Sequence, residues 1–262
     1  MARLAERLRR GERLLGMFHA LPDPALVELS AQAGFDVIVI ECEHGLRDLE
    51  SVQRQIVMAE RYGMETIVRI GRHDLGVLPR FLDAGAAGVM VAHVTSAADA
   101  EAVVKAARFP PYGERGMGYR RAAPRLGANQ QAFADADADT VVLAIVEDVA
   151  GVDRIDEIVA VPGLSGVSPG GGDLALSQGL VLDSGTHPVV SEQLERVRAA
   201  ARGRGLWTLE LLLGGVSGIP AAVERGANLM IFGLDSMLIA DLFGSIARDA
   251  RGIVAGLEEK SR

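Results

Sequence analysis

The sequence predicts a (β/α)8 barrel of the TIM type, and three observations support this fold class. Eight short β-like runs can be marked along the 262 residues, and amphipathic helical patterns separate them. Most runs are continuously apolar, as in parallel strands that are covered on both faces. Eight strand–helix units is the number that closure of such a barrel requires, whereas a doubly wound open sheet remains the alternative. We therefore expect one domain over residues 1–262.

The predicted strands are short and rich in β-branched residues, and turn residues bound most of them. They cover residues 13–20, 36–41, 65–70, 87–94, 140–147, 164–170, 206–213 and 229–235. The predicted helices carry apolar residues at spacings of three and four, and several end in glycine. They cover residues 24–34, 48–63, 77–86, 96–109, 152–161, 188–205 and 219–228.

Three further segments complete the chain. The N-terminal "MARLAERLRRGERLLG" predicts a short amphipathic helix, because charges interrupt it too often for a secretion signal. The longest irregular stretch, residues 109–131, is long enough for a lid or a binding loop. The final segment, residues 238–262, predicts a long amphipathic helix that caps the barrel or packs on another subunit.

Composition excludes several classes of partner. A formal net charge of −8 argues against nucleic acid, since phosphate binding needs a basic face. The one local basic cluster suits a solvated loop better than an anion site, and it contains Arg115, Arg120, Arg121 and Arg125. Apolar runs fall short of the ~18 residues of a membrane span, so no membrane association is expected. Cys42 is the only cysteine, which favours a cytoplasmic location.

Polar residues cluster where the predicted strands end. The active site of a (β/α)8 barrel lies at the carboxyl ends of its strands. The polar residues at these positions are Glu41, Glu43, His44, Arg69, His93, Glu147, Asp148 and Asp173. Single residues have structural interpretations too, for example Asp173 as a helix N-cap. We assign structural roles to His19, His73, His93 and His187. The gathering of the other candidates on one rim favours a functional site.

The residue types at this rim indicate metal-assisted chemistry on a 2-oxo acid. Glu147 and Asp173 follow adjacent strands, and two carboxylates brought together repel unless a cation or a proton intervenes. Such oxygen ligands suit Mg²⁺ or Mn²⁺. Arg69 can hold a carboxylate in a bidentate fork, and Gly170, Gly171 and Gly172 let backbone N–H groups approach an anion. His44 would then relay a proton beside a stabilised enolate.

The chain also resembles the HpcH/HpaI family of class II, metal-dependent pyruvate aldolases over essentially its whole length. The resemblance rests on several ordered motifs. They are "AGFDVIVIECEHGLRDLE", "VRI", "FLDAGAAGVMVAHV", "AARFPPYGERGMG", "VEDVAGVDRIDEIVAVPGL", "GGGDLALSQG" and "FGLDSMLI". It implies a TIM barrel that assembles through exchanged C-terminal helices into a homohexamer, a trimer of dimers.

The resemblance also implies a role for each site residue. Glu147 and Asp173 would bind the divalent cation, Mg²⁺ or Mn²⁺ with Co²⁺ or Zn²⁺ as alternatives. Arg69 would bind the pyruvate carboxylate, with Phe18 and Gly170 to Gly172 lining the substrate. His44 would be the acid/base residue, oriented by Glu41 and acting through water that Glu43 supports. Asp83 would reach the site of a neighbouring subunit.

Several residues depart from the family pattern and bear on acceptor specificity. Glu41 replaces the usual aspartate of the acid–histidine dyad and is one methylene longer. The other departures are Ala92 for proline, Gly171 in the turn before Asp173, Ser168-Pro169 in the sixth strand and Glu210 in the seventh. None of them changes the expected metal ligands or Arg69.

The expected activity is a metal-dependent lyase that reversibly cleaves a 4-hydroxy-2-oxo acid to pyruvate and an aldehyde through a metal-bound enolate. The alternative is Claisen-type condensation or cleavage of an acyl-CoA, as in citrate-synthase-like or malyl-CoA-lyase-like relatives. A third hypothesis is a metal-free phosphate-binding isomerase, which the glycine-rich loop 214–218 after the seventh predicted strand supports. The least favoured hypothesis is a non-catalytic binding barrel, because it does not explain why an acid, a histidine and an arginine lie on one rim.

Overall fold

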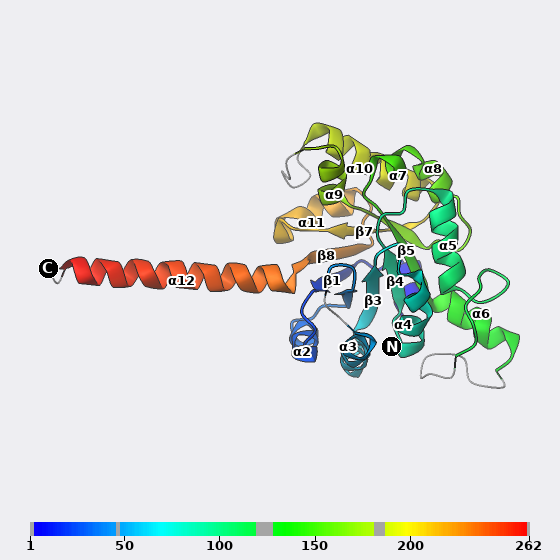
Figure 1. Ribbon diagram of the computed structural model, residues 1–262, viewed down its shortest axis with the longest axis horizontal. Coiled ribbons are helices and arrows are strands. Elements are labelled where there is room, and N and C mark those ends of the chain that lie inside the picture. Colours follow the sequence, from blue (N-terminus) through cyan, green and yellow to red (C-terminus); the bar gives the residue numbers. More distant parts are fainter. Residues whose placement is uncertain (1–2, 46–47, 119–127, 181–186, 261–262) are drawn as a thin grey trace.

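Eight parallel strands pair in chain order and close into a barrel, because β8 returns to pair with β1 (Figure 1). The computed structural model describes residues 3–45, 48–118, 128–180 and 187–260. The strands are β1 (Leu14–His19), β2 (Val37–Glu41), β3 (Glu65–Ile70), β4 (Gly88–Val91), β5 (Val141–Val146), β6 (Gly166–Pro169), β7 (Trp207–Leu211) and β8 (Leu229–Leu234). The predicted (β/α)8 fold is confirmed, and the open-sheet alternative is wrong.

The helices surround this barrel. Those before β5 are α1 (Leu4–Arg9), α2 (Pro24–Gln32), α3 (Leu49–Arg61), η1 (Leu75–Val77), α4 (Leu78–Ala84), α5 (Ala97–Ala107) and α6 (Gln130–Asp139). Those after β5 are α7 (Val149–Asp153), α8 (Ile155–Ile158), α9 (Gly171–Ser177), α10 (Pro188–Gly203), η2 (Gly215–Gly218), α11 (Ile219–Glu224) and α12 (Asp235–Lys260). Most were predicted; α6 was not, because its alternating Ala and Asp residues lack an apolar stripe.

Side chains alternate across the barrel wall and build separate apolar clusters inside and outside it. Inward residues form one cluster, to which the strands contribute Phe18, Val39, Ile67, Met90, Leu143, Leu209 and Ile231. Outward residues such as Ile38 and Ile40 pack against the helices, where Val52 and Ile56 of α3 meet them. This period of two determines which strand residues can reach the rim of the barrel interior.

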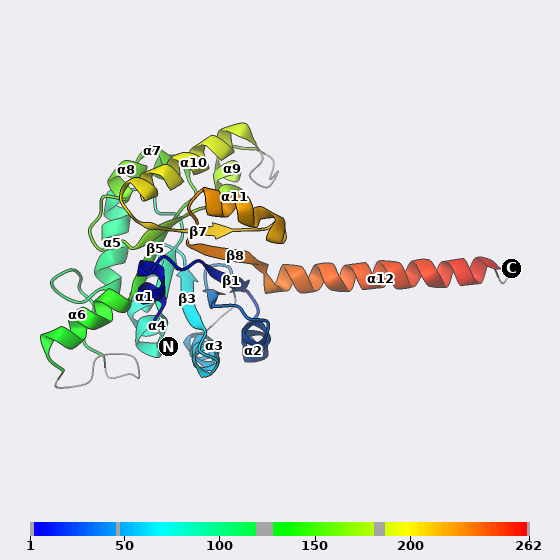
Figure 2. The ribbon, with the colours of Figure 1, turned by 180° about the vertical axis from the view of Figure 1, so that it is seen from behind.

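Helix α1 closes the amino-terminal end of the barrel (Figure 2). Its Leu4, Ala5 and Leu8 are buried in the same cluster as the inward strand residues. The short amphipathic helix expected at the N-terminus is therefore part of the core. The polar residues predicted at the strand ends lie at the opposite, carboxyl-terminal end of the barrel.

Glu210 corrects one expectation from the sequence. Its neighbour Leu209 points into the barrel, so Glu210 points outward to the helices. There it accepts two hydrogen bonds from the guanidinium of Arg198 on α10, at 2.6 and 2.9 Å. Both side chains are buried. Glu210 is thus a partner in a buried ion pair between β7 and α10, and it is not a residue of the pocket.

The two ends of the strand sequence meet at a seam between β1 and β8. Leu14 pairs with Leu229, and the register shifts by one residue between Gly16 and Phe18. Asp235, which begins α12 directly after β8, accepts hydrogen bonds from the N–H of Ala20 at 2.8 Å and from Leu21. The carboxylate therefore binds the loop after β1 to the start of the last helix.

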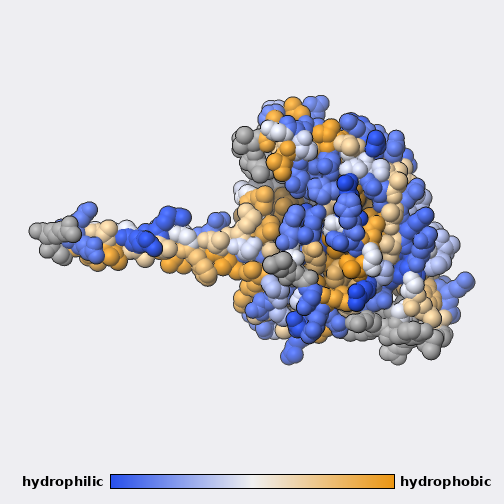
Figure 3. Space-filling model, in the orientation of Figure 1, coloured by the Kyte–Doolittle hydropathy of each residue, from blue (hydrophilic) through white to orange (hydrophobic). Residues whose placement is uncertain are grey.

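Helix α12 projects away from the barrel for nearly all its length (Figures 1 and 2). Large apolar side chains lie exposed along it, and Figure 3 shows them gathered on one side. The exposed residues include Met237, Leu238, Leu242, Phe243, Ile246, Ile253 and Val254. A surface of this kind is typical of a helix that packs on a partner.

Within the described ranges, no helix combines the length and apolar character that a membrane span needs. Of the predicted basic cluster, Arg120, Arg121 and Arg125 lie outside the described residues. Arg115 is buried and pairs with Asp83 of α4 at 2.5 Å, so it is a structural residue of the chain.

Candidate active site

Five strand ends bring the predicted residues to one rim. Glu41 ends β2 and is the register partner of Arg69 in β3, so both side chains point into the mouth of the barrel. Glu147 follows β5 directly, and His93 lies two residues beyond β4. Asp173 lies in the first turn of α9, behind β6. The rim predicted from the sequence therefore exists as one surface.

Arg69 is held by two carboxylates and an aromatic ring. Its Nη1 donates to Glu41 Oε2 at 3.0 Å, and its Nη2 contacts the Glu43 carboxylate. The guanidinium carbon lies 5.9 Å from the centre of the Phe18 ring, which is buried below it. Among the described residues, the buried Nε of Arg69 has no hydrogen-bond partner. A buried donor without a partner is unfavourable, so this atom suits an acceptor on a bound molecule.

Glu41 and His44 meet in a way that the sequence did not predict. Glu41 Oε1 accepts hydrogen bonds from the backbone N–H of Glu43 at 2.7 Å and of His44 at 3.1 Å. The His44 imidazole is exposed, and its Nε2 lies 3.6 Å from Glu43 Oε2. The expected contact from Glu41 to the imidazole is therefore replaced by a contact to the backbone. Glu41 shapes the turn that presents His44.

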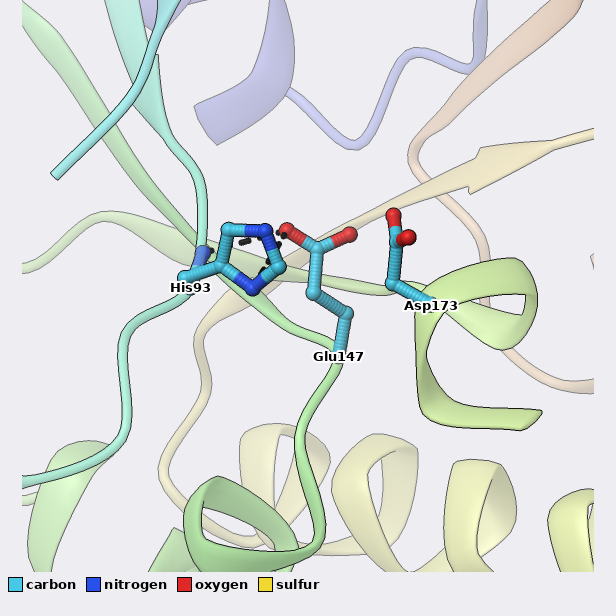
Figure 4. A group of neighbouring side chains, drawn as sticks. All are labelled: His93, Glu147 and Asp173. Atoms are coloured by element: carbon cyan, nitrogen blue, oxygen red, sulfur yellow. Dashed lines mark hydrogen bonds and ion pairs between the residues drawn. The ribbon is translucent and has the colours of Figure 1, made fainter. Parts of the chain in front are cut away.

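Glu147 and Asp173 lie together with His93 (Figure 4). One potential ligand atom from each of the three side chains lies within 4.8 Å of the others. Glu147 is almost fully buried, and the backbone N–H of His93 donates to its Oε1 at 3.0 Å. A Cβ on Gly170 would come within 2.5 Å of the Glu147 Cβ. Glycine at position 170 therefore makes room for Glu147.

Burial and neighbouring charges shift the pKa values of Glu147 and His93 in this cluster. Burial raises the pKa of Glu147 to about 7, against the opposing effects of Arg69 and His93. Burial lowers the pKa of His93, but the carboxylates of Asp148, Glu147 and Glu43 outweigh it and leave that pKa raised. A buried carboxylate beside a second one favours a cation or a proton between them. The donor set of two carboxylates and an imidazole fits a divalent cation.

Not every predicted site residue reaches this cluster. Gly171 and Gly172 form the first turn of α9 and carry Asp173, while Gly170 is the N-cap of that helix. The N-cap role considered for Asp173 is therefore wrong. Asp83 lies at the end of α4 that precedes β4, which is the end of the barrel opposite to the rim. There it pairs with Arg115, and it does not reach this cluster.

Comparisons with known proteins show the family of the chain. The family model described as HpcH/HpaI aldolase/citrate lyase matches residues 14–241. The chain belongs to this family. A hydroxypyruvate/pyruvate aldolase of Pseudomonas aeruginosa is 32% identical over 95% of the chain and 93% of its own length. A 4-hydroxy-2-oxovalerate aldolase of Novosphingobium aromaticivorans is 33% identical over 95% of the chain and 94% of its own length.

Solved structures have the same fold. The HpcH/HpaI aldolase from Desulfitobacterium hafniense DCB-2 superposes with a TM-score of 0.85 and is 29% identical over 96% of the chain and 97% of its own. The crystal structure of the citrate synthase SbnG superposes with a TM-score of 0.86 and is 28% identical over 95% of the chain and 98% of its own. This HpcH/HpaI protein is a carbon–carbon lyase of the aldolase type. Its membership argues against a metal-free isomerase at loop 214–218 and against a non-catalytic barrel.

Two residues of this HpcH/HpaI site, His93 and Asp148, were not predicted as functional residues from the sequence. His93 was assigned a structural role, and Asp148 was noted only as a strand-end acid. In the structure His93 Nδ1 lies 3.0 Å from Asp148 Oδ2 and 3.8 Å from Glu147 Oε1. The available signal was position, because each lies two residues beyond a strand end, β4 for His93 and β5 for Asp148, on the same rim.

Proposed function

We propose that the protein reversibly cleaves a 4-hydroxy-2-oxo acid into pyruvate and an aldehyde, with a divalent cation bound by Glu147 and Asp173. The observation that carries this proposal is the pairing, on one rim, of a buried carboxylate cluster with an arginine that has a free donor. Mg²⁺ and Mn²⁺ are the first candidates, and Co²⁺ and Zn²⁺ are alternatives. When bound, such a cation would polarise the carboxylate and ketone oxygens of the substrate and stabilise enolate charge.

Arg69 would bind the carboxylate of the 2-oxo acid. Glu41 and Glu43 occupy its two Nη atoms and keep the guanidinium plane fixed, so little conformational entropy is lost on binding. The Nε donor then supplies a hydrogen bond whose acceptor comes from the substrate. Phe18 beneath the guanidinium, and the glycines 170 to 172 around Glu147 and Asp173, would form the walls of the subsite.

His44 would move the proton. In the cleavage direction it accepts the proton of the 4-hydroxyl, directly or through water held by Glu43, while the C3–C4 bond breaks and the aldehyde leaves. Return of that proton to C3 gives pyruvate. The exposed position of His44 suits exchange with water, and Glu41 fixes the backbone that carries it.

The test separates enolate formation from cleavage. Purified protein with Mn²⁺ should exchange the methyl protons of pyruvate with D₂O and cleave 4-hydroxy-2-oxo acids, both measured by proton NMR. Arg69→Lys should raise the KM for the acid by about 10- to 100-fold, since a charge-assisted hydrogen bond of about 1.5–3 kcal/mol is lost. Arg72→Lys, on the same rim and exposed, is the matched control. Absence of both exchange and cleavage in metal-loaded protein refutes the proposal.

A second candidate reaction uses the same enolate with an acyl-CoA, as in Claisen condensation. The similarity to the structure of a citrate synthase supports this Claisen-type reaction as the second candidate. Release of free CoA from acetyl-CoA and oxaloacetate, measured with a thiol reagent, would select this reaction over the aldol. Aldol cleavage without CoA release would exclude it.

We also propose that the protein works as a homo-oligomer in the cytoplasm. The exposed apolar side of α12 supports packing on a second copy, and the position of Asp83 suits a site shared between subunits. A hexamer with exchanged C-terminal helices is the arrangement implied by the family. The single cysteine supports the cytoplasmic location.

A further inference from the structure

His93 is tied to the carboxylate pair by contacts from both its backbone and its ring. The backbone N–H donates to Glu147 Oε1, and ring Nδ1 lies 3.0 Å from Asp148 Oδ2. The residue has φ of +55°, a left-handed conformation that non-glycine residues seldom adopt. The chain thus holds a strained backbone at the one position that turns this imidazole toward Glu147.

The contact with Asp148 decides which ring nitrogen is available. An ionised carboxylate only accepts hydrogen bonds, so Nδ1 carries the proton and Nε2 of the neutral ring keeps its lone pair. Nε2 lies 3.9 Å from Glu43 Oε1, which is too far for a hydrogen bond, whereas Nδ1 lies 3.8 Å from Glu147 Oε1. Histidines that bind metals usually donate their other N–H to a carboxylate in this way. Asp148 and His93 have that arrangement.

The distances fit a shared cation. Potential ligand atoms of His93, Glu147 and Asp173 lie within 4.8 Å of one another (Figure 4). Ligands around a small divalent cation, at about 2.1 Å each, are separated by at most about 4.2 Å. Small movements of the three side chains, with a turn of the imidazole that brings Nε2 toward Glu147, would therefore complete the set.

We propose that His93 is the third protein ligand of the divalent cation. This inference rests on the proposed cation site at Glu147 and Asp173 and adds a nitrogen to its oxygen donors. Imidazole suits Mn²⁺, Co²⁺ and Zn²⁺ better than Mg²⁺, which prefers oxygen. The consequence is a site that prefers transition metals.

Pulsed electron paramagnetic resonance of the full chain loaded with Mn²⁺ tests this directly. A bound imidazole gives ¹⁴N modulation of the Mn²⁺ echo, which we expect in the wild type and in His73→Gln but not in His93→Gln. His73 is the matched control, because it is an exposed histidine on the loop after β3. Wild-type protein that binds Mn²⁺ without ¹⁴N modulation overturns the inference, whatever the variants do.

Metal affinity provides the second measurement. By calorimetry, His93→Gln should weaken Mn²⁺ binding by about 10- to 100-fold and Mg²⁺ binding by clearly less. Equal affinities for Mn²⁺ in wild type and His93→Gln, with folding verified by circular dichroism, would contradict the proposal.

Glu147→Gln separates this inference from the cation site itself. If Glu147→Gln binds Mn²⁺ as tightly as the wild type, the proposed cation site is wrong. If Glu147→Gln loses Mn²⁺ binding while the wild type lacks ¹⁴N modulation, only the role of His93 is wrong.

Discussion

At the scale of single residues, the turn that follows β2 connects His44, the proposed acid/base group, to Arg69, the proposed carboxylate anchor. One oxygen of Glu41 accepts the N–H groups of Glu43 and His44, and the other contacts Arg69. Its extra methylene, compared with the family's aspartate, lets one carboxylate span both partners. The role of Glu41 is therefore to position its neighbours.

This role leads to a prediction for position 41. In Glu41→Asp the shorter carboxylate can still accept the N–H groups of residues 43 and 44, as in an Asx turn, and loses only the contact to Arg69. We expect kcat/KM for aldol cleavage to stay within about tenfold of the wild type, the effect of about one hydrogen bond. His44→Ala should lose about 10²- to 10⁴-fold in kcat, the usual contribution of a positioned acid/base group.

Steady-state kinetics of both variants, with Glu41→Leu as the variant that removes every acceptor, checks these values. Equal and complete loss of activity in Glu41→Asp and His44→Ala would contradict the assigned roles.

The sequence predicted the residue types at the rim better than their contacts. Strand-end positions were enough for Glu41, Arg69, Glu147 and Asp173. The role of His93 depends on a backbone angle of +55°, which no local pattern indicates. Glu210 was considered a pocket residue because the inward and outward alternation of β7 was not applied to it.

At the scale of elements, the pair of Glu210 and Arg198 joins β7 to α10 outside the barrel wall. We expect Glu210→Ala to lower the free energy of unfolding by about 3 kcal/mol, because the buried guanidinium of Arg198 loses both hydrogen bonds and keeps only the partly exposed Glu195 carboxylate, at 3.7 Å. The double variant Glu210→Leu/Arg198→Met should recover most of the loss. Urea denaturation measures both. A change in kcat of the folded protein without a loss of stability would show that Glu210 reaches the site.

Glu65 connects β3 to the helix that closes the barrel. It is half-buried and accepts a hydrogen bond from the N–H of Leu4, and burial raises its pKa above 4.5. A raised pKa in the folded state means a stabilising contribution that is complete below pH 4.5 and is lost as the pH rises through the folded value. Glu65→Gln keeps an acceptor for Leu4 and carries no charge.

We therefore expect Glu65→Gln to gain stability relative to the wild type as the pH rises from about 4 to about 8. Denaturation curves of both proteins at several pH values give this difference. A difference that does not vary with pH would contradict the assignment.

Elements were predicted well where a periodic apolar pattern existed. The eight strands and most helices follow such patterns, with ends that differ by a few residues. Helix α6 lacks an apolar stripe, and Asp137 is its buried residue, accepting the N–H of Phe109 at 3.0 Å. A polar tertiary contact of this kind cannot be read from local periodicity.

At the scale of the whole molecule, the exposed side of α12 predicts assembly. Ile246 lies in the middle of the apolar side, whereas Arg248, two residues on, faces the opposite side. Ile246→Glu should reduce the oligomer to smaller species in light scattering coupled to size-exclusion chromatography. Arg248→Glu, which introduces the same side chain, should leave the mass unchanged. A wild-type monomer at micromolar concentration would rule out assembly through α12.

The seam between β1 and β8 determines the order of barrel closure and subunit association during translation. Because β1 is the first strand synthesised and β8 the last, the barrel cannot close until Leu234 has left the ribosome. Asp235, which then binds the N–H of Ala20, is also the first residue of α12. Domains fold as units as they emerge. The apolar surface of α12 follows β8 in the chain, so the last strand of the barrel is synthesised before the surface for a partner.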